Sequence, residues 1–581
     1  MKKILKYIKP YRVQAILGPL IKWMEAAFEL LVPLVVARLI DEAIPAGKGG
    51  DNTLLWQMCG VVSLLAVVGF GCSLVAQYFS ARAATGFAAR LRRVMFEHAG
   101  RLSHAGLDRL GSATVISRLT GDLAQVQTGV NMFLRLFLRS PFVVFGAMIM
   151  ALTVDVRASL VFVVAIPLLF IAVAVIMSLT VPKFRAVQTG SDSLFHIAGE
   201  NITGVRVIRA FGMEDEEKGR FRHSAEGLTV LQMTANKVSA FMNPVTTLLI
   251  NGAMIALIYS GAVRVNMGDL TQGEVIALVN YMSQILVELI KLANLIITVT
   301  KAIAAGGRIS EFLDTATESE ELSVGEGGIV GDPDNAVVFD NVSFTYPDAA
   351  SPSLENISFT LPRGGVLGII GPTGSGKSTL VNLIPRFYDA TEGRILVGGR
   401  DVRNIPLREL RDTVGIAEQR SRIFSGTVRD NLTMGKDIPD ERLMEALTTA
   451  QASDFIMKRE GGLDAVLSRG GKNLSGGQKQ RVNIARALAK SPDILILDDS
   501  SSALDFATDA ALRESLRQIE GMSVIIISQR AAGVRYADTI LVLDDGEAVG
   551  MGTFEELLES CSVFAEICRS QGIAGGADDE K

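Results

Sequence analysis

Six long apolar stretches fill most of the first half of the chain and constrain its fold more than any other feature. They lie at about residues 15–40, 55–79, 131–153, 158–181, 240–263 and 274–300. About 20 apolar residues in a helix cross the ~30 Å hydrocarbon core of a bilayer, and each stretch reaches that length. The first stretch is too long, and lacks a suitable exit, for a cleavable signal peptide. Residues 1–310 are therefore predicted to form an α-helical membrane domain of six transmembrane helices.

Lys and Arg residues are concentrated in alternate loops between these stretches. They recur at the N-terminus and in the two long loops at about 80–130 and 182–239, whereas the other loops hold only Lys48, Arg157 and Arg264. Loops rich in Lys and Arg stay on the cytosolic side of a membrane. We therefore expect a multi-pass protein of the cell membrane (plasma or inner membrane), with both termini and both long loops in the cytosol.

The two long loops keep a helical pattern, whereas the segment after the last apolar stretch does not. We expect the loops to be helical extensions of the membrane helices, with turns at Gly106–Gly111 and at Gly204. Segment 311–335 is rich in acidic residues and glycine, which is typical of a solvated linker. Residues 575–581 are expected to form a frayed tail.

Charged residues inside the first and sixth stretches need a physical explanation, because charge is costly in a bilayer. The polar residues that share helix faces there are Lys22, Glu25, Glu29, Gln284, Glu288 and Lys291. They are predicted to line a substrate cavity between helices. The alternative is that Lys22 extends to the interface and Glu288 simply pairs with Lys291. Arg135 and Arg139, at the cytosolic end of the third stretch, are expected to extend out of the membrane.

Composition excludes several classes of protein. The chain of 581 residues is 49% hydrophobic, which excludes a disordered protein. Its four cysteines, Cys59, Cys72, Cys561 and Cys568, are too few for a secreted disulfide framework, and we expect them to be reduced packing residues. The net charge of −5 argues against a general nucleic-acid-binding protein.

From Val337 onward, short β-rich segments alternate with helical ones, which indicates an α/β domain at 336–574. A buried strand at 366–370 runs into a loop that fits G-x-x-x-x-G-K-[ST], and the loop consists of Gly371, Pro372, Thr373, Gly374, Ser375, Gly376, Lys377, Ser378 and Thr379. In such a P-loop, backbone N–H groups wrap the phosphates, the lysine reaches the β- and γ-oxygens and the serine ligates Mg²⁺. A helix at about 377–387 should follow. The chain is therefore predicted to bind a nucleoside triphosphate.

Two further motifs fit a nucleotide-binding domain. Asp498 ends a second buried strand, 494–497, where P-loop enzymes hold Mg²⁺, and it is predicted to be a ligand of that ion. The sequence LSGGQ precedes a basic helix, and the residues Ser475, Gly476, Gly477 and Gln478 are predicted to cradle the phosphates of a nucleotide bound by another subunit. The alternative for this motif is an ordinary helix N-cap.

Together with the apolar stretches, these motifs resemble those of ATP-binding-cassette (ABC) exporters. The chain resembles a half-transporter in which a membrane domain and an α/β P-loop ATPase domain are fused, and the resemblance covers nearly the whole chain. It implies that two halves sandwich two ATP molecules, each between the P-loop of one half and the LSGGQ of the other.

The resemblance also implies roles for individual residues. Tyr346, in the sequence FTYP, matches the aromatic residue that stacks on adenine. Gln419 matches the glutamine that senses Mg²⁺, although Glu418 before it replaces a common proline. Asp505 ends the sequence SALD, which matches a loop that reaches across the dimer. Segments 200–211 and 108–122 resemble the segments that couple the two domains.

Two positions depart from the family pattern, and both are predicted to lie in the hydrolytic site. The residue after Asp498 is usually a general-base Glu, but here it is Asp499, which is one methylene shorter. The usual switch His is Gln529, whose amide cannot take up a proton. The chain therefore resembles the degenerate-site subunit of heterodimeric bacterial multidrug exporters. Its own site is predicted to bind ATP and hydrolyse it slowly, while its LSGGQ completes the active site of a different partner chain.

The resemblance further implies export of amphipathic molecules, such as drugs, lipids or peptides, by alternating access. Two alternatives remain open. The first is a homodimeric exporter, and the second is an ATP-gated regulatory or channel-type protein of the same family.

Overall fold

The computed structural model describes residues 2–48, 52–318, 330–347, 349–500 and 504–573. The chain divides into two compact units. Unit 1 comprises residues 1–100 and 113–314, and unit 2 comprises residues 101–112 and 315–581. The short segment 101–112 therefore belongs to the second unit, although it lies early in the sequence.

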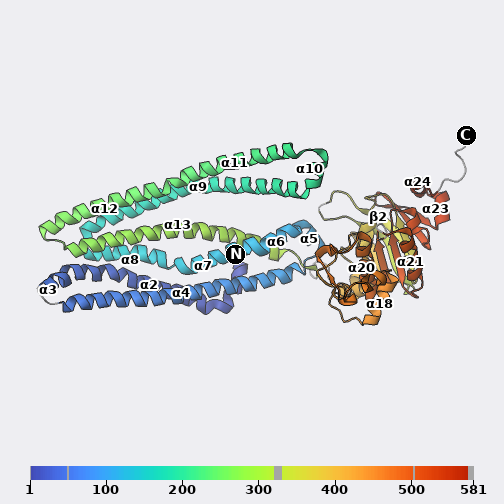
Figure 1. Cartoon of the computed structure of the whole chain (residues 1–581), viewed down its shortest axis with the longest axis horizontal. Helices are drawn as coiled ribbons and strands as arrows, with labels where there is room; N and C mark the ends of the chain where they lie inside the picture. The colour runs from blue at the N-terminus through green and yellow to red at the C-terminus, as the bar shows by residue number, and fades with distance from the viewer. Residues whose placement is uncertain (1, 49–51, 319–329, 348, 501–503, 574–581) are drawn as a thin grey trace. The chain divides into compact units, whose positions relative to one another are not determined.

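Unit 1 is a bundle of long helices that run alongside one another (Figure 1). They are α2 (Arg12–Arg38), α4 (Thr53–Ala99), α7 (Leu123–Leu136), α8 (Arg139–Val154), α9 (Val156–Thr203), α11 (Glu214–Ala240), α12 (Met242–Met267) and α13 (Gln272–Asp314). Helices cover all six apolar stretches. Among the described residues, five helical segments are long and apolar enough to cross a membrane, and they are 53–99, 112–154, 156–203, 214–267 and 272–314. The segment outside this set is α2, which carries three charged residues in its middle.

The packing of unit 1 places small residues between helices and many large apolar residues outside. Ala26, Ala83 and Ala147 are fully buried, whereas Phe70 and Leu248 are exposed. Small residues let helices approach closely in a membrane, and a broad exposed apolar surface suits contact with lipid. This arrangement agrees with a helical membrane domain.

Of the two expected turns, one agrees with the structure and the other begins later than expected. Gly204 separates α9 from α10 (Val205–Phe211), as expected. Gly106, however, lies inside α5 (His104–Leu110), because Ser103 caps that helix by accepting a hydrogen bond from the Gly106 N–H (3.0 Å). The turn occurs at Gly111, whose φ of 72° favours glycine. The third apolar stretch is also interrupted, between α7 and α8.

The expected linker is more structured at its start than its composition indicates. Helix α13 continues to Asp314, whose carboxylate accepts a hydrogen bond from Lys3 Nζ (2.8 Å). The expectation of a merely solvated joint is wrong for Glu318, which is ion-paired with Arg411 (2.7 Å). Residues 319–329 and the tail 575–581 lie outside the described residues.

Unit 2 contains a six-stranded sheet and a four-stranded antiparallel sheet. The six-stranded sheet has the order β12-β11-β3-β10-β9-β6. Its strands are β12 (Glu547–Gly552), β11 (Thr539–Asp544), β3 (Val366–Ile370), β10 (Ser523–Ile527), β9 (Ile494–Asp498) and β6 (Val414–Ala417). All pairs are parallel except β11 with β12. The other sheet has the order β2-β1-β4-β5, formed by β2 (Leu354–Pro362), β1 (Asn335–Phe344), β4 (Glu392–Val397) and β5 (Arg400–Asp401).

The central strands are almost entirely buried, which explains their continuous apolar sequences. Ile369, Ile496 and Ile525 belong to one core that joins the two sheets. The helix after β3 is α15 (Lys377–Leu383), which is shorter than the expected 377–387. It ends early because Pro385 lacks the N–H that would continue the helical hydrogen bonds and Arg386 adopts a φ of 55°, which is not helical.

We expect Gly273→Ala to destabilise unit 1. A Cβ atom at Gly273 would lie 2.3 Å from the carbonyl oxygen of Ala37, and the Gly273 N–H donates to Asp41 Oδ1 (2.8 Å). Relieving this overlap must displace α2 from α13, at a cost of about 1–3 kcal/mol. The thermal unfolding midpoint of the full chain in mild detergent should fall.

The matched control is Gly252→Ala in α12, where a Cβ atom meets no other atom of the described chain within 4 Å. Alanine favours a helix over glycine, so this midpoint should stay equal or rise. Equal midpoints for the two variants would contradict the packing described for Gly273.

Candidate nucleotide site and membrane cavity

Four adjacent parallel strands of unit 2 end at one edge of the sheet. The register pairs Ile369 with Ile527, Ile527 with Asp498, and Leu497 with Ala417. The loops that follow these strands are therefore neighbours, and they begin at Gly371, Ser528, Asp499 and Glu418. This edge is where open α/β sheets place their ligands. The structure thus brings the P-loop, the acidic pair, Gln529 and Gln419 to one place.

Glycine gives the P-loop its shape. Gly374 and Gly376 have φ values of 90° and 91°, which side chains with a Cβ rarely adopt. Gly371 packs against the neighbouring strand β11, where a Cβ would lie 2.0 Å from the carbonyl oxygen of Leu543. Substitution at any of these positions would deform the loop that leads into α15.

Lys377 is buried and held inside the loop. Its Nζ donates to the carbonyl oxygens of Gly371 (2.9 Å) and Pro372 (2.5 Å) and lies 3.2 Å from Ser375 Oγ. Burial lowers the pKa of Lys377, and nearby acidic groups oppose that effect. The lysine is therefore positioned by the loop it serves.

Ser378 and Asp498 form the predicted metal site. Ser378 Oγ donates toward the Asp498 carboxylate, at 3.2 Å from Oδ1 and 3.0 Å from Oδ2. Burial raises the pKa of Asp498; the hydroxyl of Ser378 opposes the shift, and the neighbouring Asp499 adds to it. A hydroxyl and a carboxylate are the hard oxygen ligands that Mg²⁺ takes together with phosphate oxygens. The residues present therefore fit this ion.

Asp499 and Gln419 are in contact. Gln419 Nε2 donates to Asp499 Oδ2 (3.2 Å), and Gln480 Nε2 donates to the Asp499 carbonyl oxygen (3.2 Å). Asp499 has a φ of 44°, a conformation uncommon for residues with a side chain. Gln529 is exposed, and its carbonyl oxygen accepts a hydrogen bond from Gln571 Nε2 (2.8 Å).

Tyr346 lies beside the P-loop helix. Its hydroxyl is 3.2 Å from Thr379 Oγ1. Its ring makes an edge-on contact with Tyr388, with 5.2 Å between the centroids. The structure therefore places this aromatic ring next to the predicted phosphate site, although Tyr346 follows a strand of the other sheet.

The LSGGQ residues form a helix N-terminus. Ser475 Oγ accepts a hydrogen bond from the Gln478 N–H (3.3 Å), and Gln478 Oε1 accepts one from the Ser475 N–H (3.0 Å), at the start of α20 (Gly476–Ala489). The ordinary N-cap that the sequence left open is thus present, as a capping box. Its role toward a nucleotide stays a prediction.

Asp505 is also an N-cap, of α21 (Phe506–Arg517). Its Oδ1 accepts a hydrogen bond from the Thr508 N–H (2.9 Å), and this bond lowers the pKa of Asp505. Ser502 and Ala503 of the same predicted loop lie outside the described residues.

A cavity of about 450 Å³ lies between α2 and α13 in unit 1. Its polar lining residues are Glu29, Asn280, Ser283, Gln284, Glu288 and Lys291. The structure thus brings four of the predicted cavity residues together, and they are Glu29, Gln284, Glu288 and Lys291. Glu25 does not line this cavity, because its carboxylate pairs with Lys22 Nζ (2.5 Å).

Lys22, for which extension to the interface was the alternative, and Arg139, which was expected to extend out of the membrane, are both buried among helices. Lys22 also donates to Ser73 Oγ of α4 (3.0 Å). Arg139 is 6% exposed and contacts the carboxylates of both Glu288 and Glu29. Both residues find carboxylate partners inside the bundle, which makes extension to water unnecessary.

The sequence did not predict that Arg139 is an ion-pair partner of Glu288. Glu288 is 2% exposed and also accepts hydrogen bonds from Ser140 Oγ (2.8 Å) and Lys291 Nζ (2.8 Å). Pairing with Lys291, the simpler alternative, is therefore real but incomplete. A buried carboxylate needs compensation, and this was the available signal; the sequence alone did not show that α8 supplies it.

Comparison with known proteins gives a consistent picture. Residues 16–289 match the family described as ABC transporter transmembrane region, and residues 354–502 match the family described as ABC transporter. An uncharacterized ABC transporter ATP-binding protein of Mycobacterium tuberculosis is 35% identical over 98% of each chain. An ATP-dependent lipid A-core flippase of Salmonella typhimurium is 30% identical over 97% of this chain and 96% of its own. The fold is similar to that of a bacterial Atm1-family ABC exporter with ATP bound, with a TM-score of 0.79, 24% identity and 99% of each chain covered.

We expect Tyr346→Ala to weaken ATP binding by about 5- to 150-fold, because stacking of an aromatic ring on a base contributes roughly 1–3 kcal/mol. Tyr346→Phe keeps the ring and loses only the contact with Thr379, so it should bind ATP almost as the unmodified chain does. Titration of the purified full chain with a fluorescent ATP analogue measures both. Equal losses in the two variants would assign the effect to the hydroxyl rather than to stacking.

Proposed function

Because this chain belongs to the ABC transporter family, as a half-exporter that fuses a transmembrane region with an ATP-hydrolysing domain, we propose that it exports amphipathic molecules together with a second half-transporter. Drugs, lipids and peptides are the candidate substrates. The flippase from Salmonella typhimurium, by its name, acts on a lipid A-core. A cavity with both polar and apolar lining suits molecules that combine the two characters.

The proposed membrane arrangement has six spans. It adds α2 to the five apolar segments, since the charges of α2 are paired or line the cavity rather than facing lipid. The loop charges favour both termini and the ATPase domain in the cytosol, and the cell (inner or plasma) membrane as the location.

In the proposed nucleotide site, Tyr346 stacks on adenine and the P-loop with Lys377 binds the phosphates. Ser378 and Asp498 would hold Mg²⁺ with Gln419 nearby. Mg²⁺ supplies neutralisation of phosphate charge when bound. The chain's own residues would orient the phosphates and hold them in one arrangement.

Asp499 with Gln529 is the observation that carries the proposal of slow hydrolysis. A general base must lie within about 2.6–3.2 Å of the proton that it takes, and an error near 1 Å can lower the rate about 100-fold. Asp499 is one methylene shorter than Glu, and its carboxylate is engaged by Gln419. Gln529 can donate a hydrogen bond but cannot carry a charge.

The combination of an intact LSGGQ with the departures at Asp499 and Gln529 favours an asymmetric pair. In this proposal, the P-loop of this chain and the LSGGQ of the partner form a slow site. Ser475, Gly476, Gly477 and Gln478 of this chain complete the fast site of a different partner chain, in which Asp505 also takes part. A homodimer is the alternative, and the first experiment below separates the two.

The transport cycle follows from alternating access. ATP binding closes the two ATPase domains, and the cytosolic helical extensions transmit closure to the membrane helices. The cavity then opens outward, and hydrolysis at the fast site resets the pair. ATP acts at the slow site mainly by favouring one conformation.

We expect the double variant Asp499→Glu with Gln529→His to raise the ATPase rate of the purified chain about 10- to 100-fold, because it restores the reach of the base and a titratable switch residue. The measurement is phosphate release in lipid nanodiscs. Adding Lys377→Ala to the double variant is the control, and it should abolish the gain.

Two results would contradict the proposed asymmetry. One is robust ATP turnover by the unmodified chain purified alone, with a native mass of twice the single chain. The other is a double variant with no gain in rate. Either result would favour a homodimer whose hydrolysis uses the present residues.

We expect Gln284→Met to change, at least fivefold, the concentration of the amphipathic dye Hoechst 33342 that half-maximally stimulates the ATPase activity. Gln284 lines the cavity, and its Oε1 is buried without a hydrogen-bond partner in the described part of the chain. The basal rate should stay unchanged. Gln188→Met, on the exposed surface of α9, is the control, since Gln188 pairs only locally with Asp192 (3.0 Å). An identical dye dependence in Gln284→Met and the unmodified chain would contradict the cavity assignment.

A further inference from the structure

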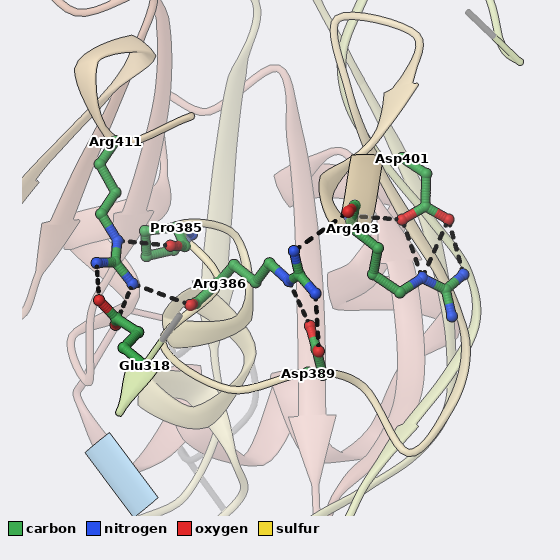
Figure 2. A network of polar contacts seen from close by, with 7 residues as sticks. All are labelled: Glu318, Pro385, Arg386, Asp389, Asp401, Arg403 and Arg411. Carbon is green, nitrogen blue, oxygen red and sulfur yellow. Dashed lines mark hydrogen bonds and ion pairs between the residues drawn. The ribbon is translucent and has the colours of Figure 1, made fainter. Parts of the chain in front are cut away.

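The four residues that follow α13, 315–318, belong to unit 2, and we call them the connector. Glu318 accepts two hydrogen bonds from the guanidinium of Arg411, from Nη1 to Oε2 (2.9 Å) and from Nη2 to Oε1 (2.7 Å), as Figure 2 shows. A bidentate pair of this kind is directional as well as strong. Burial tends to raise the pKa of Glu318, but the hydrogen bonds from Arg411 hold the pKa below its ordinary value. The pair therefore stays ionised.

Arg411 also holds the turn that follows the P-loop helix. Its Nε donates to the carbonyl oxygen of Pro385 (3.1 Å), and its Nη2 donates to that of Arg386 (3.1 Å). Arg386 is 2% exposed, and its side chain is itself fixed by two hydrogen bonds to Asp389 (2.6 and 3.0 Å). One guanidinium thus joins the connector to a rigid turn that begins two residues after α15.

Arg411 lies on α16 (Leu407–Thr413), which runs directly into β6 and then into Gln419. The segment that carries the clamp is therefore continuous with the loop that meets Asp499. The connector is tied in this way both to the end of the P-loop helix and to the strand that leads to the hydrolytic residues.

Helix α5 is seated on the same turn. The ring of His104 stacks on Phe387, with 4.4 Å between centroids, and the Arg411 guanidinium lies over the same ring at 5.2 Å. Tyr388 donates its hydroxyl to Asp108 Oδ2 (2.5 Å). The connector and the segment before α5 also bond to each other, through the Glu318 N–H and the Arg101 carbonyl oxygen (2.8 Å).

We propose that the Glu318–Arg411 pair is a positioning device for ATP-driven transport. It clamps the connector to the turn after the P-loop helix. A conformational change caused by nucleotide binding is thereby passed to the C-terminal end of α13 through the connector, which is covalently continuous with that helix, in addition to any effect through α5. The inference rests on the proposed function, because it assumes that nucleotide binding drives the membrane helices. Neither Glu318 nor Arg411 is proposed to touch nucleotide or metal.

Hydrogen–deuterium exchange of the full chain in lipid nanodiscs tests the proposal, with and without the non-hydrolysable analogue AMP-PNP and Mg²⁺. In the unmodified chain, AMP-PNP should slow exchange both in the P-loop and at residues 302–314 of α13. In Glu318→Gln, the nucleotide-dependent change at 302–314 should fall at least threefold, while P-loop protection and analogue affinity stay within twofold. Glu409→Gln is the matched control, because Glu409 lies on the same helix and pairs with Arg400 (2.6 Å) at the surface.

The double variant Glu318→Gln with Arg411→Lys completes the test. If the two residues act as one pair, the double variant should change the response at 302–314 no more than the more severe single variant does. Additive effects would overturn the proposal, as would a normal response in Glu318→Gln, a simultaneous loss of P-loop protection, or an unmodified chain with no response at 302–314. None of these readouts depends on hydrolysis, so a failed asymmetry of the two ATP sites leaves the test interpretable.

Discussion

The parallel pairing of β3, β10, β9 and β6 is the constraint on which the ATPase unit depends. Parallel strands place all their carboxyl ends at one edge, and the register fixes how far each strand reaches. The pairing of Ile527 with Asp498 sets the acidic pair level with the loop that holds Gln529. A slip of one residue in β9 would turn Asp498 away from Ser378. Groups from distant parts of the sequence meet because their strands end at this edge. The turn that contacts the connector is also positioned from this edge, because β3 leads through the P-loop and α15 to that turn.

Much of the fold and of the candidate site could be predicted because the relevant signals are local. An apolar stretch of about 20 residues reports a membrane helix wherever it lies, and the P-loop carries its geometry in consecutive residues. Strand β3 and the start of β9 lie where the sequence predicted them. The early end of α15 was not predicted, because a proline alone does not decide it: α2 and α9 continue through prolines, whereas Arg386 after Pro385 leaves the helical region. The roles of Asp499 and Gln529 are of a different kind, because they concern rates rather than geometry.

Partners across long distances in sequence could not be predicted. Arg139 and Glu288 are separated by 149 positions, and Glu318 and Arg411 by 93. Composition indicates only that an acidic segment prefers water, and it cannot show that one member of the segment meets a guanidinium. Gly106 was misread for a similar reason, because glycine is compatible with a turn but also with a helix that packs closely, as α5 does at Thr315. In each case tertiary contact decided between two locally acceptable conformations.

The ion cluster around Arg139 has a consequence for how the membrane unit can move. Arg139 on α8 is shared by Glu29 on α2 and Glu288 on α13, and all three helices meet in one core. Separating them would leave a charge unpaired away from water, at a cost of about 3–5 kcal/mol. These three helices are therefore held together at this level by charge as well as by apolar packing, and α9 and α12 contribute Phe162 and Leu257 to the same core.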